Sequence, residues 1–180
     1  MSARAGRALL GVVAVLAAAA GCASTEVRRS HPQLASKDDP EQATVYFLRP
    51  AVERSGLSGV FGHGEDPIAV DVGGHELLVI LEGDYVVAHL KPYLGMVALR
   101  QWHTIQNPPS PGTAAPTAST VVIHGGRQFT LFGRETYCFV VHAAEWSDGL
   151  AIEKVERAQA AEFASKLRPV GDAVDEPIRP

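Results

Sequence analysis

The chain has 180 residues, a net charge of −4 and 46% hydrophobic residues, which suits one folded domain with flanking segments. Its lysine and arginine side chains are scattered rather than gathered in a basic stripe, which argues against nucleic acid as a partner. From the N-terminus onward, the predicted elements are a leader, a tether and a β domain.

Residues 1–21 have the pattern of a secretory leader. Arg4 and Arg7 supply the positive start, and an unbroken apolar run of 13 residues follows from Ala8 to Ala20. A transmembrane helix needs about 20 apolar residues, whereas the apolar part of a leader needs about 7–15. The sequence therefore predicts a signal peptide that is removed from the mature protein.

Cys22 follows the apolar run directly, behind the small residues Ala19, Ala20 and Gly21. This arrangement resembles the lipobox of bacterial lipoproteins, although that pattern usually has leucine where Ala19 stands. The resemblance implies lipidation of Cys22 and a lipid-anchored place in the cell envelope. The residue after the cysteine is Ala23 rather than aspartate. In this the chain resembles lipoproteins that are sorted to the outer membrane and face the periplasm in a host with two membranes. Ordinary leader cleavage without a lipid is the alternative.

Residues 22–42 are predicted to form a lipid-anchored flexible tether. They are polar, mixed in charge and interrupted by Pro32 and Pro40, and they show no apolar period. A flexible coil of this length spans on the order of 25 Å, which would lift the following domain off the lipid headgroups.

From residue 43 the sequence changes to short β-type runs separated by turn residues. The clearest hairpin joins residues 68–72 to residues 75–81 through Gly73-Gly74, because glycine allows the positive φ that tight hairpin turns need. Arg49, directly after the first strand, is expected at that strand's solvated end.

Later segments extend the β pattern. A second strand pair is predicted between residues 83–90 and 96–102, and Gly125-Gly126 is interpreted as another turn. Residues 107–119 form a Pro-rich loop that is long for a compact domain, and its role is not assigned.

The one helix is predicted over residues 156–167, which are alanine-rich and free of glycine and proline. Ala160, Phe163 and Leu167 share a face that can dock on a sheet. The fold class is therefore mainly β, an antiparallel β-sandwich over residues 43–168 with one C-terminal α-helix. Residues 169–180 are predicted to be a disordered tail.

With these elements placed, the body resembles a family of small bacterial lipoprotein β domains of unknown function. The family opens with a V-Y-F-x-R-P strand, continues with a Gly-rich loop and a hairpin, and has later G-x-Y and Y-x-F-V strands. The matching residues are Val45, Tyr46, Phe47, Arg49, Pro50, Gly56, Gly59, Gly62, Val70, Gly73, Gly74, Gly83, Tyr85, Tyr137, Phe139 and Val140. The match spans roughly residues 43–167 and implies an envelope β-sandwich without an established activity.

Motifs that carry chemistry are incomplete. Residues 56–60 lack the last glycine of a G-x-S-x-G elbow, and no histidine has metal-ligand spacing. We therefore assign no catalytic, metal or cofactor-binding residue. Strands can still bring His75, His89 and His142 together, so an envelope hydrolase or metal-binding protein that uses converging histidine and acidic residues is the alternative function. Cys138, in an apolar run, is predicted to be a small buried hydrophobe.

Three aromatic residues are candidates for an interaction surface, namely Tyr93, Trp102 and Trp146, because they lie at strand ends or in loops. Exposed together, they would suit an envelope protein or a glycan; buried separately, they belong to the core. The function predicted from sequence is thus a non-catalytic binding or structural module, displayed at the membrane through its N-terminal lipid.

Overall fold

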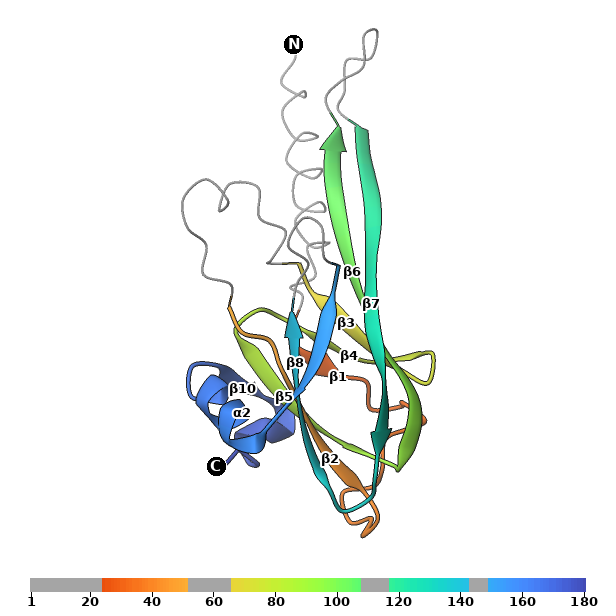
Figure 1. The fold of residues 1–180 in the computed structure, drawn as a ribbon. Coiled ribbons are helices and arrows are strands. Elements are labelled where there is room, and N and C mark those ends of the chain that lie inside the picture. Colours follow the sequence, from red (N-terminus) through yellow and green to blue (C-terminus); the bar gives the residue numbers. More distant parts are fainter. Residues whose placement is uncertain (1–23, 52–65, 108–116, 143–148) are drawn as a thin grey trace, which may run out of the picture.

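The computed structural model describes residues 24–51, 66–107, 117–142 and 149–180, which form two packed β-sheets and a helix (Figure 1). In spatial order, the first sheet contains β1 (Glu26–Val27), β4 (His75–Ile80), β3 (Ile68–Val72), β6 (Tyr93–Asn107) and β7 (Thr117–Leu131). The second sheet contains β10 (Arg168–Val170), β5 (Asp84–Leu90), β2 (Ala43–Leu48), β8 (Thr136–His142) and β9 (Ala151–Val155). The predicted fold class, a mainly β sandwich with one helix, is confirmed.

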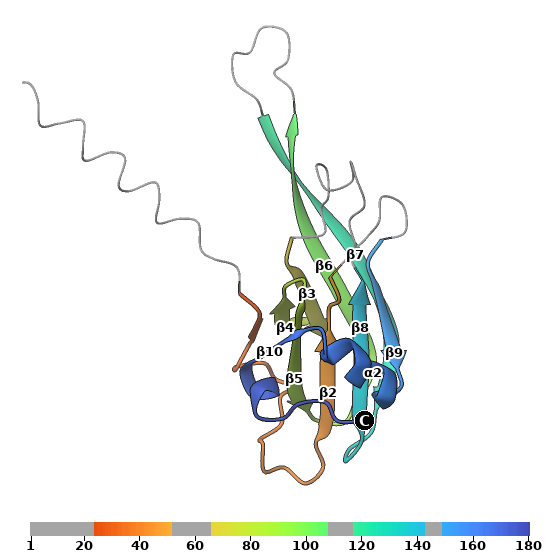
Figure 2. The same cartoon turned by 90° about the vertical axis from the view of Figure 1, so that its left-hand side faces the viewer.

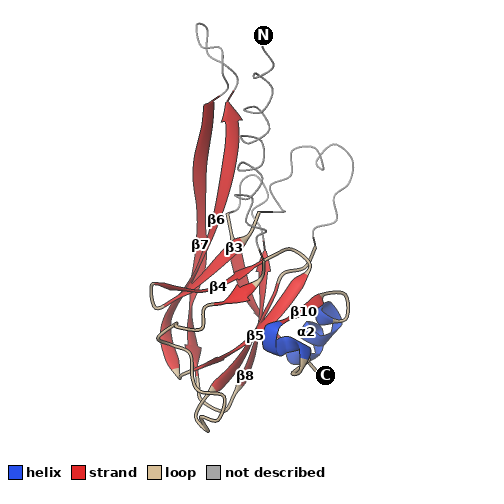
Figure 3. Cartoon of the chain, turned by 180° about the vertical axis from the view of Figure 1, so that it is seen from behind, coloured by secondary structure: helices blue, strands red, loops and turns tan. Residues whose placement is uncertain are grey.

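The central strands of the second sheet, β5, β2 and β8, are buried on both faces. Its inner face meets the first sheet in the main core, where the rings of Phe47 and Phe139 pack 5.8 Å apart. Its outer face is covered by helix α2 (Arg157–Ala164) and the 3-10 helix η2 (Gly171–Val174), as Figure 3 shows. Strands buried on both faces have near-continuous apolar runs rather than alternating ones. Every residue of β5 is buried accordingly, and its polar residues Asp84 and His89 are buried with the rest. The predicted helix therefore exists and docks on a sheet, with Ala160 fully buried.

The two long sides of the sandwich differ. On one side β7 meets β9 through a bridge between Gly125 and Leu150, which joins the edges of the two sheets. On the other side the edges formed by β1 and β10 stay apart, and residues 24–42 run along this gap (Figure 2). We call residues 24–42 the N-terminal strap.

The hairpin of β6 and β7 is longer than the sandwich. The two strands pair without interruption from Tyr93 and Leu131 to Asn107 and Thr117. The neighbouring strand β3 pairs with β6 only between Val97 and Gln101. Beyond Gln101 the hairpin projects from the body as a two-stranded ribbon (Figures 1 and 2). We call this ribbon, residues 102–107 and 117–122, the arm.

The predicted flexible tether is wrong for its described part, residues 24–42. β1 adds to the first sheet beside β4, and the Arg28 amide donates to the Leu77 carbonyl at 2.8 Å. Val27 and Leu34 pack against the main core, which explains why a mostly polar segment folds down. Isolated apolar residues produce no periodic signal, so the sequence pattern gave no sign of this docking.

The predicted disordered tail, residues 169–180, is also wrong. β10 pairs in parallel with β5. Ala173 and Ile178 are buried in a second hydrophobic core, which lies between the outer face of the second sheet and helix α2. The Tyr46 hydroxyl donates to the Glu176 carbonyl at 3.1 Å. The folded unit therefore extends beyond the predicted 43–168 at both ends.

The hairpin of β3 and β4 is confirmed, with Gly73 and Gly74 at φ of 63° and 81°. The predicted pairing of residues 83–90 with 96–102 is wrong, because β5 and β6 belong to different sheets. Gly125-Gly126 lies inside β7 rather than in a turn. In the segment predicted as the Pro-rich loop, Asn107 ends β6 and residues 117–119 start β7, while residues 108–116 lie outside the described part.

Among the described residues, no helix has both the length and the apolar character needed to cross a bilayer.

Candidate functional site

A buried carboxylate holds the start of the N-terminal strap. Asp84 is 2% exposed and accepts hydrogen bonds from the Thr25 hydroxyl at 2.5 Å and from Nε and Nη2 of Arg168 at 2.8 and 2.9 Å. The Thr25 oxygen also accepts from the Leu81 amide at 2.9 Å. One side chain thus joins the strap, the start of β5 and the C-terminal segment, so Thr25 is fixed in place.

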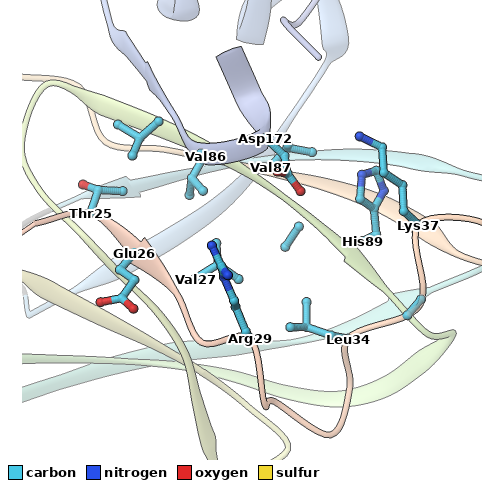
Figure 4. A pocket seen from close by; sticks show the side chains of 14 residues that line it. Thr25, Glu26, Val27, Arg29, Leu34, Lys37, Val86, Val87, His89 and Asp172 are labelled. Atoms are coloured by element: carbon cyan, nitrogen blue, oxygen red, sulfur yellow. The ribbon is translucent and has the colours of Figure 1, made fainter. Parts of the chain in front are cut away.

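The strap and the second sheet enclose a cavity of about 570 Å³ at the open side of the sandwich (Figure 4). Val27, Leu34 and Val86 supply apolar walls, and Arg29 and Lys37 lie along the strap's side. Mixed apolar walls and polar groups are typical of small-molecule sites. The cavity is therefore the first place where catalytic chemistry has to be sought.

The most buried titratable group of this cavity is His89, which is 8% exposed. Its Nε2 atom lies 3.1 Å from Oε2 of Glu176, and Lys37 Nζ lies 2.8 Å from Oε1 of the same carboxylate. The hydrogen bond from Lys37 and the charge of His89 hold the pKa of Glu176 below its ordinary value. Nδ1 of His89 has no hydrogen-bond partner within the described part of the chain.

These groups do not form a nucleophile-and-base arrangement. The Thr25 hydroxyl lines the same cavity, but both of its hydrogen-bonding roles are used by Asp84 and Leu81. A nucleophilic mechanism needs a hydroxyl or thiol within about 2.6–3.2 Å of its base. The described lining of the cavity therefore gives no support to a hydrolase.

The three histidines considered for convergence are placed apart. His75 lies against His31, whose Nε2 is 3.2 Å from the His75 carbonyl oxygen. His89 contacts Glu176, and His142 lies 3.8 Å from Glu153 on β9. Within the described residues, no group of three or more histidine, cysteine, aspartate or glutamate side chains could hold a metal ion.

Cys138 lies in β8 under helix α2 and is 2% exposed, so the prediction of a buried hydrophobe is confirmed. Burial raises the pKa of its thiol to about 11. Thiolate, the reactive form, is therefore about 100-fold scarcer at pH 8 than for a thiol with a pKa of 9.

We expect Cys138 to be inert toward a thiol reagent in the folded protein at pH 8 and to react fully in urea. The Cys22→Ser variant, which leaves Cys138 as the one cysteine, allows the reaction to be followed by absorbance. Fast, complete labelling of the folded variant would show that this thiol is accessible.

The aromatic candidates do not form one surface. Tyr93 is half-buried, and its hydroxyl donates to the Met96 carbonyl and accepts from the Gly73 amide, both at 3.0 Å. Trp102 is 38% exposed and lies nine residues further along β6, about 30 Å away at ~3.3 Å per residue. Trp146 lies outside the described residues. Tyr93 thus stabilises a turn, and Trp102 alone remains as an exposed candidate.

Trp102 lies at the base of the arm. The Arg100 guanidinium lies 5.0 Å from the centre of its ring and is itself held by Asp71 through bonds of 2.5 and 2.7 Å. The cross-strand partner Val122 is 38% exposed and Val121 is 42% exposed. The arm thus begins with an ordered tryptophan and two exposed valines.

Sequence reasoning misplaced Arg49 and missed Asp84. Arg49 is 1% exposed rather than solvated, and its Nη1 donates to the Ile80 carbonyl at 2.9 Å, which links β2 to the end of β4. Asp84 lies at the start of the segment predicted as a strand, residues 83–90. Nothing local marks it as the acceptor for Thr25 and Arg168, which lie 59 and 84 positions away. The arm did leave a signal, because residues 101–126 contain no lysine, arginine, aspartate or glutamate although 20% of the chain is charged.

Comparison with protein-family models, with curated proteins and with solved structures finds no match to this chain. The class defined here is accordingly that of the fold: a two-sheet β-sandwich with an N-terminal strap and a projecting two-stranded arm.

Proposed function

We propose that this chain is a bacterial cell-envelope lipoprotein, anchored through lipid on Cys22, whose β-sandwich is a non-catalytic binding or structural module. The observation that carries the anchor is the order of residues 4–22: two arginines, 13 apolar residues and then small residues that end at cysteine. The described domain begins almost at once after it, with Thr25 buried. A folded body directly behind the cleavage point suits a membrane-held protein.

The absence of a nucleophile-and-base pair in the described cavity, together with the exposed Trp102, Val121 and Val122 of the arm, favours binding over catalysis. An envelope protein or a glycan remains the proposed class of partner beside the membrane. Chemical crosslinking of the lipidated protein in native envelopes, followed by purification and identification of the crosslinked species, addresses this part of the proposal. Recovery of uncrosslinked protein at every crosslinker length would speak against a stable envelope partner.

For the anchor, we expect Cys22→Ser to abolish incorporation of a fatty-acid probe and to move the protein from the membrane fraction to the soluble or precursor fraction. Cys138→Ala is the matched control, because it removes the other cysteine and leaves the proposed acceptor in place. Stable anchoring needs at least two acyl chains at about 0.8 kcal/mol per buried methylene. Unchanged labelling of Cys22→Ser would refute lipidation at this residue.

A further inference from the structure

The start of the N-terminal strap and the arm lie at the same end of the sandwich. Register pairs place Ile80 beside Ile68, and Ile68 beside Gln101, in one row across the first sheet. Since Glu26 pairs with Val79, Thr25 lies next to this row. The arm starts at the same row, immediately after Gln101.

The chain also leaves Thr25 in the direction in which the arm projects. From Val27 back to Thr25, the chain runs parallel to β4 from Leu78 to Ile80. Through β3, this direction is also that of β6 from Leu99 to Gln101, where the arm begins. Figures 1 and 2 show the start of the described chain and the arm at this same end.

Covalent geometry limits how far Cys22 can lie from this end. Three residues span at most about 11 Å from Thr25, because an extended chain covers ~3.6 Å per residue. The arm continues for six residues past Gln101, about 20 Å at ~3.3 Å per residue. Measured along the strands, the described end of the arm thus lies about 9 Å beyond the furthest position of Cys22, so the strands have to tilt away from the membrane normal for the arm to stay at the depth of Cys22. A bilayer that holds Cys22 meets the arm before it meets the rest of the described sandwich.

The composition of the arm suits such a contact. It has no lysine, arginine, aspartate or glutamate to desolvate, and Trp102, Val121 and Val122 are exposed. Tryptophan is enriched at membrane–water interfaces, where its ring meets both acyl chains and headgroups.

The depth of the contact is limited by the backbone. Beyond Gln101, β6 pairs with β7 alone among the described strands, so the arm has polar groups along free edges. Such groups are costly in hydrocarbon but find water in the headgroup layer. From this geometry, and resting on the proposed lipid anchor, we propose that the arm is a second membrane contact that lies in the headgroup layer of the bilayer holding Cys22 and orients the sandwich on it.

Tryptophan quenching by brominated lipids tests this proposal. Full mature lipidated protein carrying Trp146→Phe, which leaves Trp102 as the sole tryptophan, is reconstituted in phosphatidylethanolamine–phosphatidylglycerol vesicles. We expect Trp102 emission to fall about twofold when the acyl chains are brominated near their headgroup end. The matched control is Phe132→Trp in a background of Trp102→Phe and Trp146→Phe. Phe132 is 59% exposed and lies nine residues along the chain from Ile123, the partner of Gln101, so we expect no quenching there.

A second variant checks that the exposed arm itself makes the contact. Val122→Asp places a charge beside Trp102 and should remove most of the quenching, whereas Gln128→Asp, exposed on the same strand beyond the arm, should leave it intact. Circular dichroism establishes that both variants are folded.

The outcomes separate the two proposals. Equal emission of Trp102 in brominated and ordinary vesicles, with the fatty-acid label still on Cys22, overturns the arm contact and leaves the lipoprotein assignment standing. Equal quenching of Trp102 and of the Phe132→Trp control also overturns it, since the sandwich then has no fixed orientation. Crosslinking between arms of two copies without quenching assigns the arm to self-association instead. Absence of the fatty-acid label on Cys22 would contradict the proposed lipid anchor. It would also contradict the arm contact, which rests on that anchor.

Discussion

Gly125→Ala is expected to destabilise the protein by about 3 kcal/mol and to lower its melting temperature by roughly 9 °C. Gly125 lies in β7 where that strand crosses β9, and it bridges to Leu150. A Cβ at this position would overlap the Leu150 carbonyl oxygen, which is backbone and has no rotamer through which to escape. The substitution therefore has to separate the two sheets at the one side where their described edges meet.

Urea unfolding of the Cys22→Ser form measures this effect without the lipid. Gln128→Ala, exposed on the same strand, is the matched control and should change stability by less than about 0.5 kcal/mol. If Gly125→Ala unfolds at the same urea concentration as the control, the close crossing of β7 and β9 does not exist in solution.

Asp84→Ala is expected to cost a similar amount, about 3 kcal/mol, because it removes a buried acceptor of charged and neutral hydrogen bonds together. The substitution leaves the Thr25 hydroxyl without its acceptor and releases Arg168 to solvent. Asp84→Asn should cost less, since an amide oxygen can still accept from Thr25. Asp38→Ala is the matched control, an exposed aspartate on the strap with the same change in charge.

Loss of Asp84 should also release the strap before the sandwich unfolds. Amide hydrogen exchange at Arg28 measures this local opening, because its amide donates to the Leu77 carbonyl and is protected while the strap is docked. Faster exchange in Asp84→Ala but not in Asp38→Ala is the expected result. Unchanged protection of the Arg28 amide would mean that β1 holds the strap without the carboxylate.

Docking of the strap changes how the proposed anchor would work. A flexible segment of 20 residues would keep the sandwich on the order of 25 Å from the membrane, whereas a fixed Thr25 leaves three residues and about 11 Å. The open side of the sandwich, with its cavity, is closed over by the same segment. If the proposed anchor is present, the fold rather than a loose linker sets the position and orientation of the sandwich at the membrane.

Sequence patterns were sufficient where the cause of the structure is local. The hairpin of β3 and β4 follows from alternating residues around two glycines, and helix α2 follows from an alanine-rich run. The burial of Cys138 follows from its apolar neighbours. These features depend on residues that are a few positions apart, so the local sequence contains all of the information needed to predict them.

Other features depend on partners that the chain brings together only when folded. Gly125 was predicted to lie in a turn, but glycine is used both in turns and where two backbones cross closely. The contact with the Leu150 backbone shows that Gly125 is of the second kind. Arg49 looked solvated because a charged residue after a strand usually is, and the Ile80 carbonyl across the sandwich reverses this. Neither partner can be identified from local spacing.

By itself, the sequence determined that this is a mainly β protein and that an apolar run of signal-peptide length stands just before Cys22, because periodicity, turn glycines and the apolar run are local properties. The tertiary structure alone decided that residues 24–42 are docked, that Asp84 holds their start, and that the uncharged stretch of residues 101–126 includes an arm at the end where the strap begins. Each of these depends on contacts between residues tens of positions apart. Such contacts form when the gain from burying isolated groups exceeds the entropy lost by ordering the chain between them.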